Sequence, residues 1–152
     1  MTEQELRAVL SDYLTLLQRH PSAEEMTAAV LTEDFETGFE DGHLWKGLDG
    51  LRDFLAARDG FFDESHRIQD VLELEARAED EVYARTRLTF FLRSWAAPAA
   101  TSTEYTGDCF HHWRVVRAPD RWRVGAQIVE RFDNLNDAAE RLFATPAAGL
   151  NR

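Results

Sequence analysis

The stretch TEYTGDCFHHWRVV, residues 103–116, defines the architecture of the chain more clearly than any other segment. Side chains along a β-strand point alternately to the two faces of a sheet. The odd-numbered positions are the more apolar set, so we expect them to face a hydrophobic interior. This alternation predicts that His111 points inward and that its neighbour His112 points outward.

Three further strands are predicted, at about 66–77, 81–95 and 122–132. The same alternation places Arg85, Arg87 and Arg93 on the outer face of the second of them. The predicted inner faces comprise His66, Ile68, Asp70, Leu72 and Leu74; Val82, Ala84, Leu88, Phe90 and Leu92; and Trp122, Val124, Ala126, Ile128, Glu130 and Phe132. Four polar residues, His66, Asp70, His111 and Glu130, therefore stand on an otherwise apolar face. Buried ionisable groups cost free energy unless they are paired, and a pocket is a common reason for their presence.

The N-terminal part of the chain carries helix signals. Thr2 and Glu5 have capping-box spacing before an amphipathic segment that ends ahead of Pro21, and Ser22 with Glu25 opens a second, short helix. The segments 34–39 and 43–47 suggest a hairpin, 48–60 a third helix ending at Gly60, and 136–143 a last helix. Helices followed by long antiparallel strands indicate an α+β fold, with one domain over 1–143 and a mobile tail at 144–152.

Composition excludes several classes of function. The chain has 152 residues and a net charge of −11, which disfavours binding to nucleic acid or to an anionic membrane. A single cysteine, Cys109, excludes an internal disulfide framework, and the five histidines show no metal-binding spacing. No segment approaches the roughly 20 apolar residues of a membrane span, and no nucleotide-binding motif is present. We therefore expect a cytoplasmic protein without metal or cofactor.

Four segments carry a resemblance to a known family: LTEDF at 31–35, WKGLDGLRDFL at 45–55, ESHRIQDV at 64–71 and PDRWRVGAQIV at 119–129. Their order and spacing resemble the SnoaL-like branch of the nuclear transport factor 2-like superfamily. The resemblance implies a cone-shaped fold in which N-terminal helices pack on a curved, mainly antiparallel sheet and enclose one pocket.

The resemblance also implies a function. Relatives such as polyketide cyclases, scytalone dehydratase and ketosteroid isomerase move protons on small hydrophobic molecules without a cofactor. In several of them the histidine at the position of His66 is the general base, while Tyr13 and His111 fall near the oxyanion-stabilising residues of ketosteroid isomerase. The implied activity is that of a lyase, isomerase or cyclase on a hydrophobic, for example aromatic or polyketide-like, substrate. The residues expected to contact this substrate are Asp70, Trp45, Phe90, Trp113 and Glu130.

Three alternatives stay open at this point. A buried His111 also fits a purely structural role. The aspartate that orients the histidine in the dehydratases is absent from LLQRHPS at 16–22, so Asp34, Glu36 or Asp41 of the hairpin are the candidates to replace it. The strand at 81–95 resembles that of ring-hydroxylating dioxygenase β subunits, which suggests a non-catalytic scaffold as the second function. In either case the arginine-rich outer face favours a homodimer or a higher homo-oligomer.

Overall fold

The computed structural model describes residues 1–144 of the chain, so the predicted tail lies outside the described residues from position 145 onward. The described part contains four helices and six strands. They run in the order α1 (Glu3–Leu17), α2 (Ala23–Ala29), β1 (Leu31–Phe39), β2 (Leu44–Lys46), α3 (Gly47–Ala57), β3 (Phe61–Ala78), β4 (Glu81–Ser94), β5 (Thr103–Arg117), β6 (Trp122–Asp133) and α4 (Asp137–Ala144). The predicted α+β class is confirmed.

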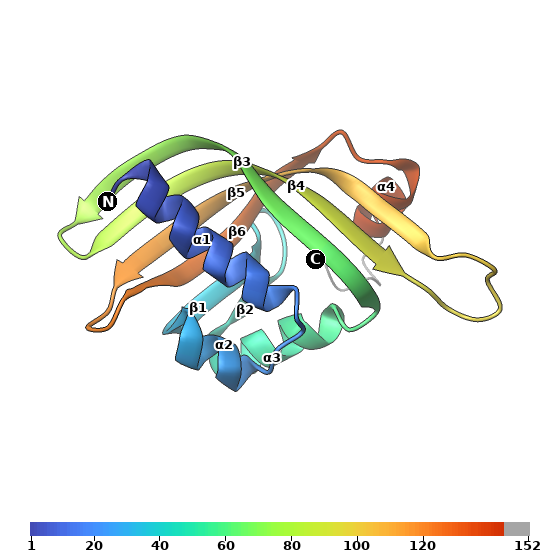
Figure 1. Ribbon diagram of the computed structural model, residues 1–152, viewed down its shortest axis with the longest axis horizontal. Coiled ribbons are helices and arrows are strands. Elements are labelled where there is room, and N and C mark those ends of the chain that lie inside the picture. The colour runs from blue at the N-terminus through green and yellow to red at the C-terminus, as the bar shows by residue number, and fades with distance from the viewer. Residues whose placement is uncertain (145–152) are drawn as a thin grey trace.

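The six strands form one open, mixed sheet in the order β2-β1-β6-β5-β4-β3. The pairing of β1 with β6 is parallel, and the other four pairings are antiparallel. Figure 1 shows the long strands curving around α1, which lies across one face of the sheet, with α2 and α3 beside β1 and β2. Helix α4 packs against β5. This arrangement confirms the predicted cone-shaped fold, in which helices pack on a curved, mainly antiparallel sheet.

The helix ends follow the capping signals of the sequence. The backbone N–H of Thr2 donates to Glu5 Oε2 at 2.7 Å and that of Glu5 donates to Thr2 Oγ1 at 3.1 Å, which completes the capping box of α1. Ser22 accepts from the backbone of Glu25 in α2. Helix α3 ends earlier than predicted, at Ala57, because its last turn tightens: the Arg58 N–H donates to the carbonyl three residues back, that of Leu55.

The predicted alternation holds along β4 and β5. Cys109, His111, Trp113 and Val115 are all buried, whereas His112 lies on the outer face, where its Nε2 is 2.9 Å from Glu130 Oε1. In β4 the predicted inner residues Val82, Ala84, Leu88, Phe90 and Leu92 are likewise buried. The assignment of His111 to the interior is therefore confirmed.

In β3 and β6 the predicted alternation is wrong in the middle of each strand, because β-bulges interrupt both strands. There, register shifts occur between Ile68 and Asp70 and between Val71 and Glu73 in β3, and opposite Phe110/His111 and Arg114/Val115 in β6. Each bulge inserts one extra residue, so the residues after the first bulge change face, and those after the second, such as Leu74 and Phe132, return to the predicted inner face. The structure consequently places Asp70 and Glu130 on the outer face, which corrects their predicted inward position.

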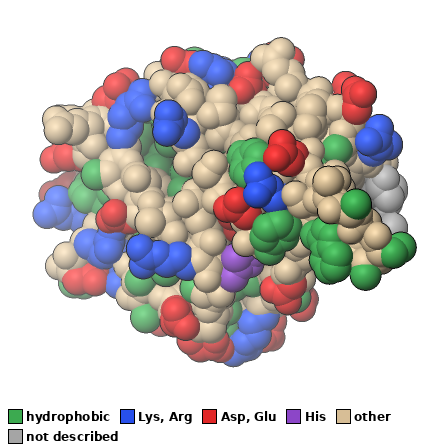
Figure 2. Space-filling model, turned by 45° about the vertical axis from the view of Figure 1, so that its right-hand side comes forward, with side chains coloured by type: hydrophobic (Ala, Val, Ile, Leu, Met, Phe, Trp, Pro, Cys, Tyr) green, Lys and Arg blue, Asp and Glu red, His purple; other side chains and the backbone are tan. Residues whose placement is uncertain are grey.

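The outer face of the sheet is a network of paired charges. Arg85 binds Glu130 through two hydrogen bonds of 2.6 and 3.0 Å, and Arg87 donates to Asp70 at 2.7 Å. Figure 2 shows acidic and basic side chains interspersed over the surface in that view, without a broad patch of one sign. Within residues 1–144 no helix is both long and apolar enough to cross a membrane.

Candidate active site

A cavity with about 100 Å³ of space for the centre of a water molecule lies between the helices and the inner face of the sheet. Its walls are mainly aromatic and aliphatic: Leu17, Phe39, Trp45, Phe54, Phe61, Leu88, Phe90, Leu92, Val129, Phe132 and Phe143. Polar side chains reach it at six positions, Thr37, Arg58, His66, Cys109, His111 and Gln127. A concave, largely apolar space with a few polar groups is the usual form of a small-molecule site.

His66 and Glu64 form a hydrogen-bonded pair at this cavity. The two residues stand two positions apart on β3, so both side chains point to the inner face. His66 Nε2 lies 3.0 Å from Glu64 Oε2. Because an ionised carboxylate only accepts hydrogen bonds, Nε2 carries the proton and the lone pair of the neutral ring is on Nδ1. The backbone N–H of His66 donates to Gln18 Oε1 at 2.8 Å, which connects this part of β3 to the end of α1.

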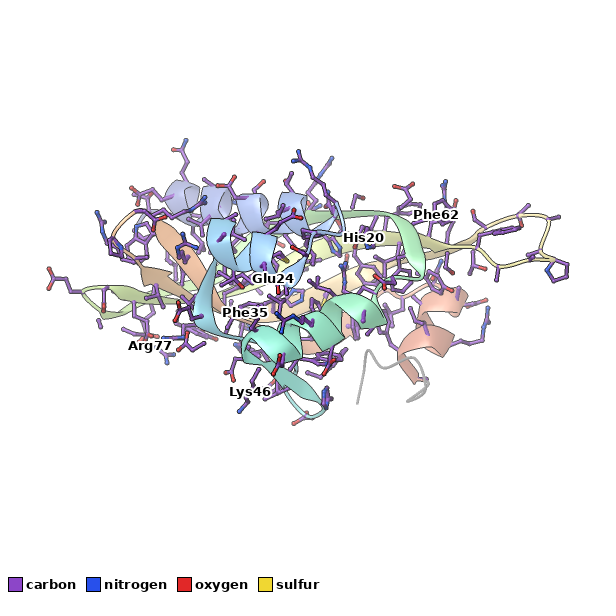
Figure 3. All side chains as sticks on the ribbon, turned by 90° about the horizontal axis from the view of Figure 1, so that it is seen from below. His20, Glu24, Phe35, Lys46, Phe62 and Arg77 are labelled. Carbon is purple, nitrogen blue, oxygen red and sulfur yellow. The ribbon has the colours of Figure 1, made fainter. Side chains whose placement is uncertain are left out.

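Glu64 is the centre of a buried charged cluster. Its side chain is fully buried and forms an ion pair with Arg58, while His20 Nε2 lies 3.2 Å from its Oε1. Figure 3 shows His20 just beyond the end of α1, close to the start of β3. Burial alone would raise the pKa of Glu64, but the hydrogen bond from His66 and the positive charge of Arg58 outweigh it and lower that pKa. Glu64 is therefore a carboxylate at neutral pH.

The imidazole ring of His66 is neutral at pH 7. Burial lowers its pKa below the usual 6.5, the hydrogen bond and charge of Glu64 act in the opposite direction, and Arg58 lowers it further. The net shift is downward, so the ring is unprotonated at pH 7. A neutral imidazole with its N–H held by a carboxylate can accept a proton from a bound molecule.

A chain of hydrogen bonds fixes the second cavity histidine, His111. The buried hydroxyl of Tyr13 donates to Gln127 Oε1, so the amide NH₂ of Gln127 faces His111 Nε2, at 3.2 Å. An amide nitrogen only donates, hence His111 Nε2 accepts and the ring proton is on Nδ1. Burial, with smaller contributions from His66 and His112, lowers the pKa of His111 to about 3. His111 is thus a neutral ring with a fixed Nδ1–H donor.

The structure brings some of the predicted site residues together and separates others. His66, His111, Trp45 and Phe90 all line the cavity. Tyr13 and Trp113 lie behind its wall, where their rings pack edge to face with centroids 5.6 Å apart. Tyr13 is buried on the inner face of α1, as predicted, and contacts Gln127, but it is not among the residues that line the cavity. Asp70 and Glu130 stand on the opposite face of the sheet, bound to Arg87 and Arg85.

Three residues of the site were missed by the sequence analysis: Glu64, Arg58 and Gln127. Extending the β3 alternation two residues toward the N-terminus would have found Glu64, which shares the parity of His66. The hairpin candidates do not hold His66: Asp34 contacts Thr32 and Arg114, and Glu36 contacts Lys46. Nothing in the pattern could find Gln127, because the bulge in β6 turns it inward.

The fold and cavity define a class of protein: an α+β domain that encloses a small-molecule pocket. The chain belongs to the SnoaL-like domain family, whose model matches residues 2–126. No curated protein matches the sequence. Among residues 1–144 no group of three or more His, Cys, Asp or Glu side chains is placed to hold a metal ion.

Solved structures show the same fold at low sequence identity. A candidate scytalone dehydratase from Novosphingobium aromaticivorans DSM 12444 is 18% identical, with a TM-score of 0.72 over 88% of this chain and 85% of the other. The hexachlorocyclohexane dehydrochlorinase LinA-type3 from Novosphingobium barchaimii LL02 is 14% identical, with a TM-score of 0.67 over 88% and 87%. The Kfla4162 protein from Kribbella flavida is 16% identical, with a TM-score of 0.73 over 89% and 93%.

Proposed function

We propose that this protein is a cofactor-independent enzyme of the lyase, isomerase or cyclase type, with His66 as its general base. One observation carries the proposal: a neutral histidine, held through Nε2–H by the buried carboxylate of Glu64, lines an apolar cavity. Burying such a pair costs free energy, and a proton-transfer site is a function that repays the cost. The dehydratase and dehydrochlorinase names among the structural neighbours agree with this class of chemistry.

The geometry suggests the order of events. His66 Nδ1 takes a proton from a carbon of the substrate, and the pair of electrons of the broken C–H bond moves into the substrate. Glu64 stabilises the imidazolium that forms, and the His111 Nδ1–H donates to the atom on which negative charge develops. Return of the proton to another carbon gives isomerisation, loss of a leaving group gives elimination, and attack on a second carbonyl gives cyclisation.

The direct test is proton exchange, which does not require the natural substrate. A panel of apolar carbon acids, including 2-tetralone and a chlorinated cyclohexane, is incubated with the protein in D₂O, and deuterium uptake or halide release is followed. We expect reaction with at least one compound, its loss in H66A and its retention in H112A. His112 is the matched control, because it neighbours His111 in sequence but lies on the outer face. No reaction with any compound, or equal rates in H66A and the wild type, would overturn the proposal and favour the scaffold role.

A further inference from the structure

Two buried donors at the cavity have no hydrogen-bond partner within the described part of the chain: Arg58 Nη1 and His111 Nδ1. Both residues line the same cavity and are almost completely buried, at 6% and 5% exposure. A buried donor left without a partner destabilises the protein until a ligand or a water satisfies it. Two such donors in a cavity with mainly carbon walls indicate that the guest supplies oxygen acceptors.

The guanidinium of Arg58 is fixed in place by its neighbours. Arg58 follows α3 directly, its Nη2 pairs with Glu64, and its charged carbon lies 5.5 Å from the centre of the Phe54 ring. A side chain held through one nitrogen and one face is pre-organised, so little entropy is lost when a ligand engages another of its nitrogens. Nη1 is the guanidinium nitrogen that is buried without a hydrogen-bond partner.

The charge balance of the cavity discriminates between possible acceptors. Among the described residues that line it, Arg58 is the one with a permanent charge, and Glu64 already neutralises it. His66 and His111 are neutral at pH 7, since burial lowers the pKa of each. A carboxylate guest would add an unbalanced negative charge near Glu64 in an apolar space, which is costly. A carbonyl oxygen carries no such cost.

We propose that Arg58 is a substrate-binding residue whose Nη1–H donates to a neutral carbonyl oxygen of an otherwise apolar ligand, with His111 Nδ1–H as a second donor. The substrate class is therefore an aromatic or alicyclic ketone or ester, rather than a carboxylate or an oxygen-free halocarbon. That the ligand is a substrate rests on the proposed function. That Arg58 and His111 bind a carbonyl oxygen does not depend on the proposed function. When His66 removes a proton beside the carbonyl, the electrons of the C–H bond form C=C and the oxygen becomes the anion that these donors hold.

The test is equilibrium binding of three ligands with closely related skeletons: acetophenone, ethylbenzene and benzoate. The variant R58Q/E64Q removes both members of the buried pair, so that neither charge is left alone. Its matched control, R87Q/D70N, removes an ion pair of the outer face. We expect R58Q/E64Q to weaken acetophenone binding about 10- to 100-fold, as expected for a hydrogen bond to a charged group, while ethylbenzene binding changes less than about twofold. Benzoate should bind the wild type more weakly than acetophenone, and R87Q/D70N should match the wild type.

The carbonyl stretching frequency of bound acetophenone provides a readout that needs no variant. Hydrogen bonding to the guanidinium should lower this frequency in the wild type relative to acetophenone in an apolar solvent. An unshifted frequency, an equal loss of acetophenone and ethylbenzene binding in R58Q/E64Q, or tighter binding of benzoate would overturn the proposal. H66A should keep the ligand preference of the wild type, so a failure of the proposed catalytic role and a failure of carbonyl recognition are distinguishable.

Discussion

Glu64 and His66 lie two residues apart on β3, and their side chains meet on the inner face, with Glu64 Oε2 at 3.0 Å from His66 Nε2. The carboxylate and the imidazole are thus positioned by one strand, in which residues two positions apart have their Cα atoms about 7 Å apart and their side chains on the same face. Their relative geometry does not depend on how α1 packs against the sheet. What α1 and the segment after it add is support, through Gln18 and His20.

Replacing His66 by alanine should lower turnover about 10²- to 10⁴-fold, the usual contribution of a positioned general base. The fold should remain intact, because His66 contributes a polar edge of the cavity rather than core packing. Steady-state kinetics with a responsive compound from the exchange panel, together with circular dichroism, measure both effects. An unfolded H66A protein would identify His66 as a structural core residue.

The pH dependence of the rate should report the pKa of His66. Activity requires the neutral ring, so the rate should be level at neutral pH and fall on acidification, with a midpoint below 6.5 because burial lowers the pKa. In E64Q the hydrogen bond and charge that raise this pKa are gone, while burial and Arg58 remain. The fall in the rate of E64Q on the acid side of its pH–rate profile should therefore occur at lower pH than in the wild type. The maximal rate of E64Q should be at least about tenfold lower, because the His66 ring loses its orientation. A rate that falls at higher pH in E64Q than in the wild type would contradict the pairing of Glu64 with His66.

The sequence predicted the fold well because strong local signals agree with one another. Capping boxes at Thr2 and Ser22, and the uninterrupted alternation along β4 and β5, gave the helices, the strands and the inward position of His111. Where nothing disturbs the repeat of two residues, parity alone places a side chain on the correct face.

The candidate site was harder to predict, because bulges change parity without a clear sequence signal. The extra residues in β3 and β6 turned Asp70 and Glu130 outward, and the shift in β6 brought Gln127 inward. Arg58 was hidden for another reason. It follows a helix as an ordinary charged residue, and only the three-dimensional meeting of α3 with β3 places it against Glu64.

Replacing Tyr13 by phenylalanine should destabilise the protein more than it slows catalysis. The hydroxyl of Tyr13 donates to Gln127 Oε1 in a fully buried position, so its loss leaves an amide oxygen unsatisfied at a cost of about 1–3 kcal/mol. Tyr13 acts on the cavity only through Gln127 and His111, so turnover should fall less than in H66A. Urea unfolding and steady-state rates of Y13F measure the two quantities. A rate loss as large as that of H66A would indicate that Tyr13 contacts the substrate directly.

We expect a homodimer that associates through the outer face of the sheet. A dimer with a dissociation constant of about 1 µM is formed when the protein concentration is tens of micromolar. Sedimentation at such a concentration should therefore give twice the 17.4 kDa mass of the chain. Ile128 lies opposite His112 on this face, so I128E should dissociate the dimer by placing a charge in the contact. L48E changes an exposed position of α3 and serves as the control. A wild-type monomer under these conditions would contradict the prediction.

His111 should make the folded state sensitive to acid. Its pKa is about 3 in the folded protein, because burial disfavours the charged ring, against 6.5 for an exposed histidine. Between these values the unfolded chain binds a proton that the folded protein does not, so the free energy of unfolding falls as the pH drops from about 6.5 toward 3. At pH 4.5 the loss from this residue should be about 2–3 kcal/mol relative to pH 7. Urea unfolding of the wild type and of H111Q at pH 7 and pH 4.5 tests this. Between these pH values the free energy of unfolding of H111Q should fall by about 2–3 kcal/mol less than that of the wild type, whatever the stability of H111Q at pH 7. Equal decreases in the two proteins would show that His111 takes up its proton without unfolding, and that its surroundings accommodate the charge.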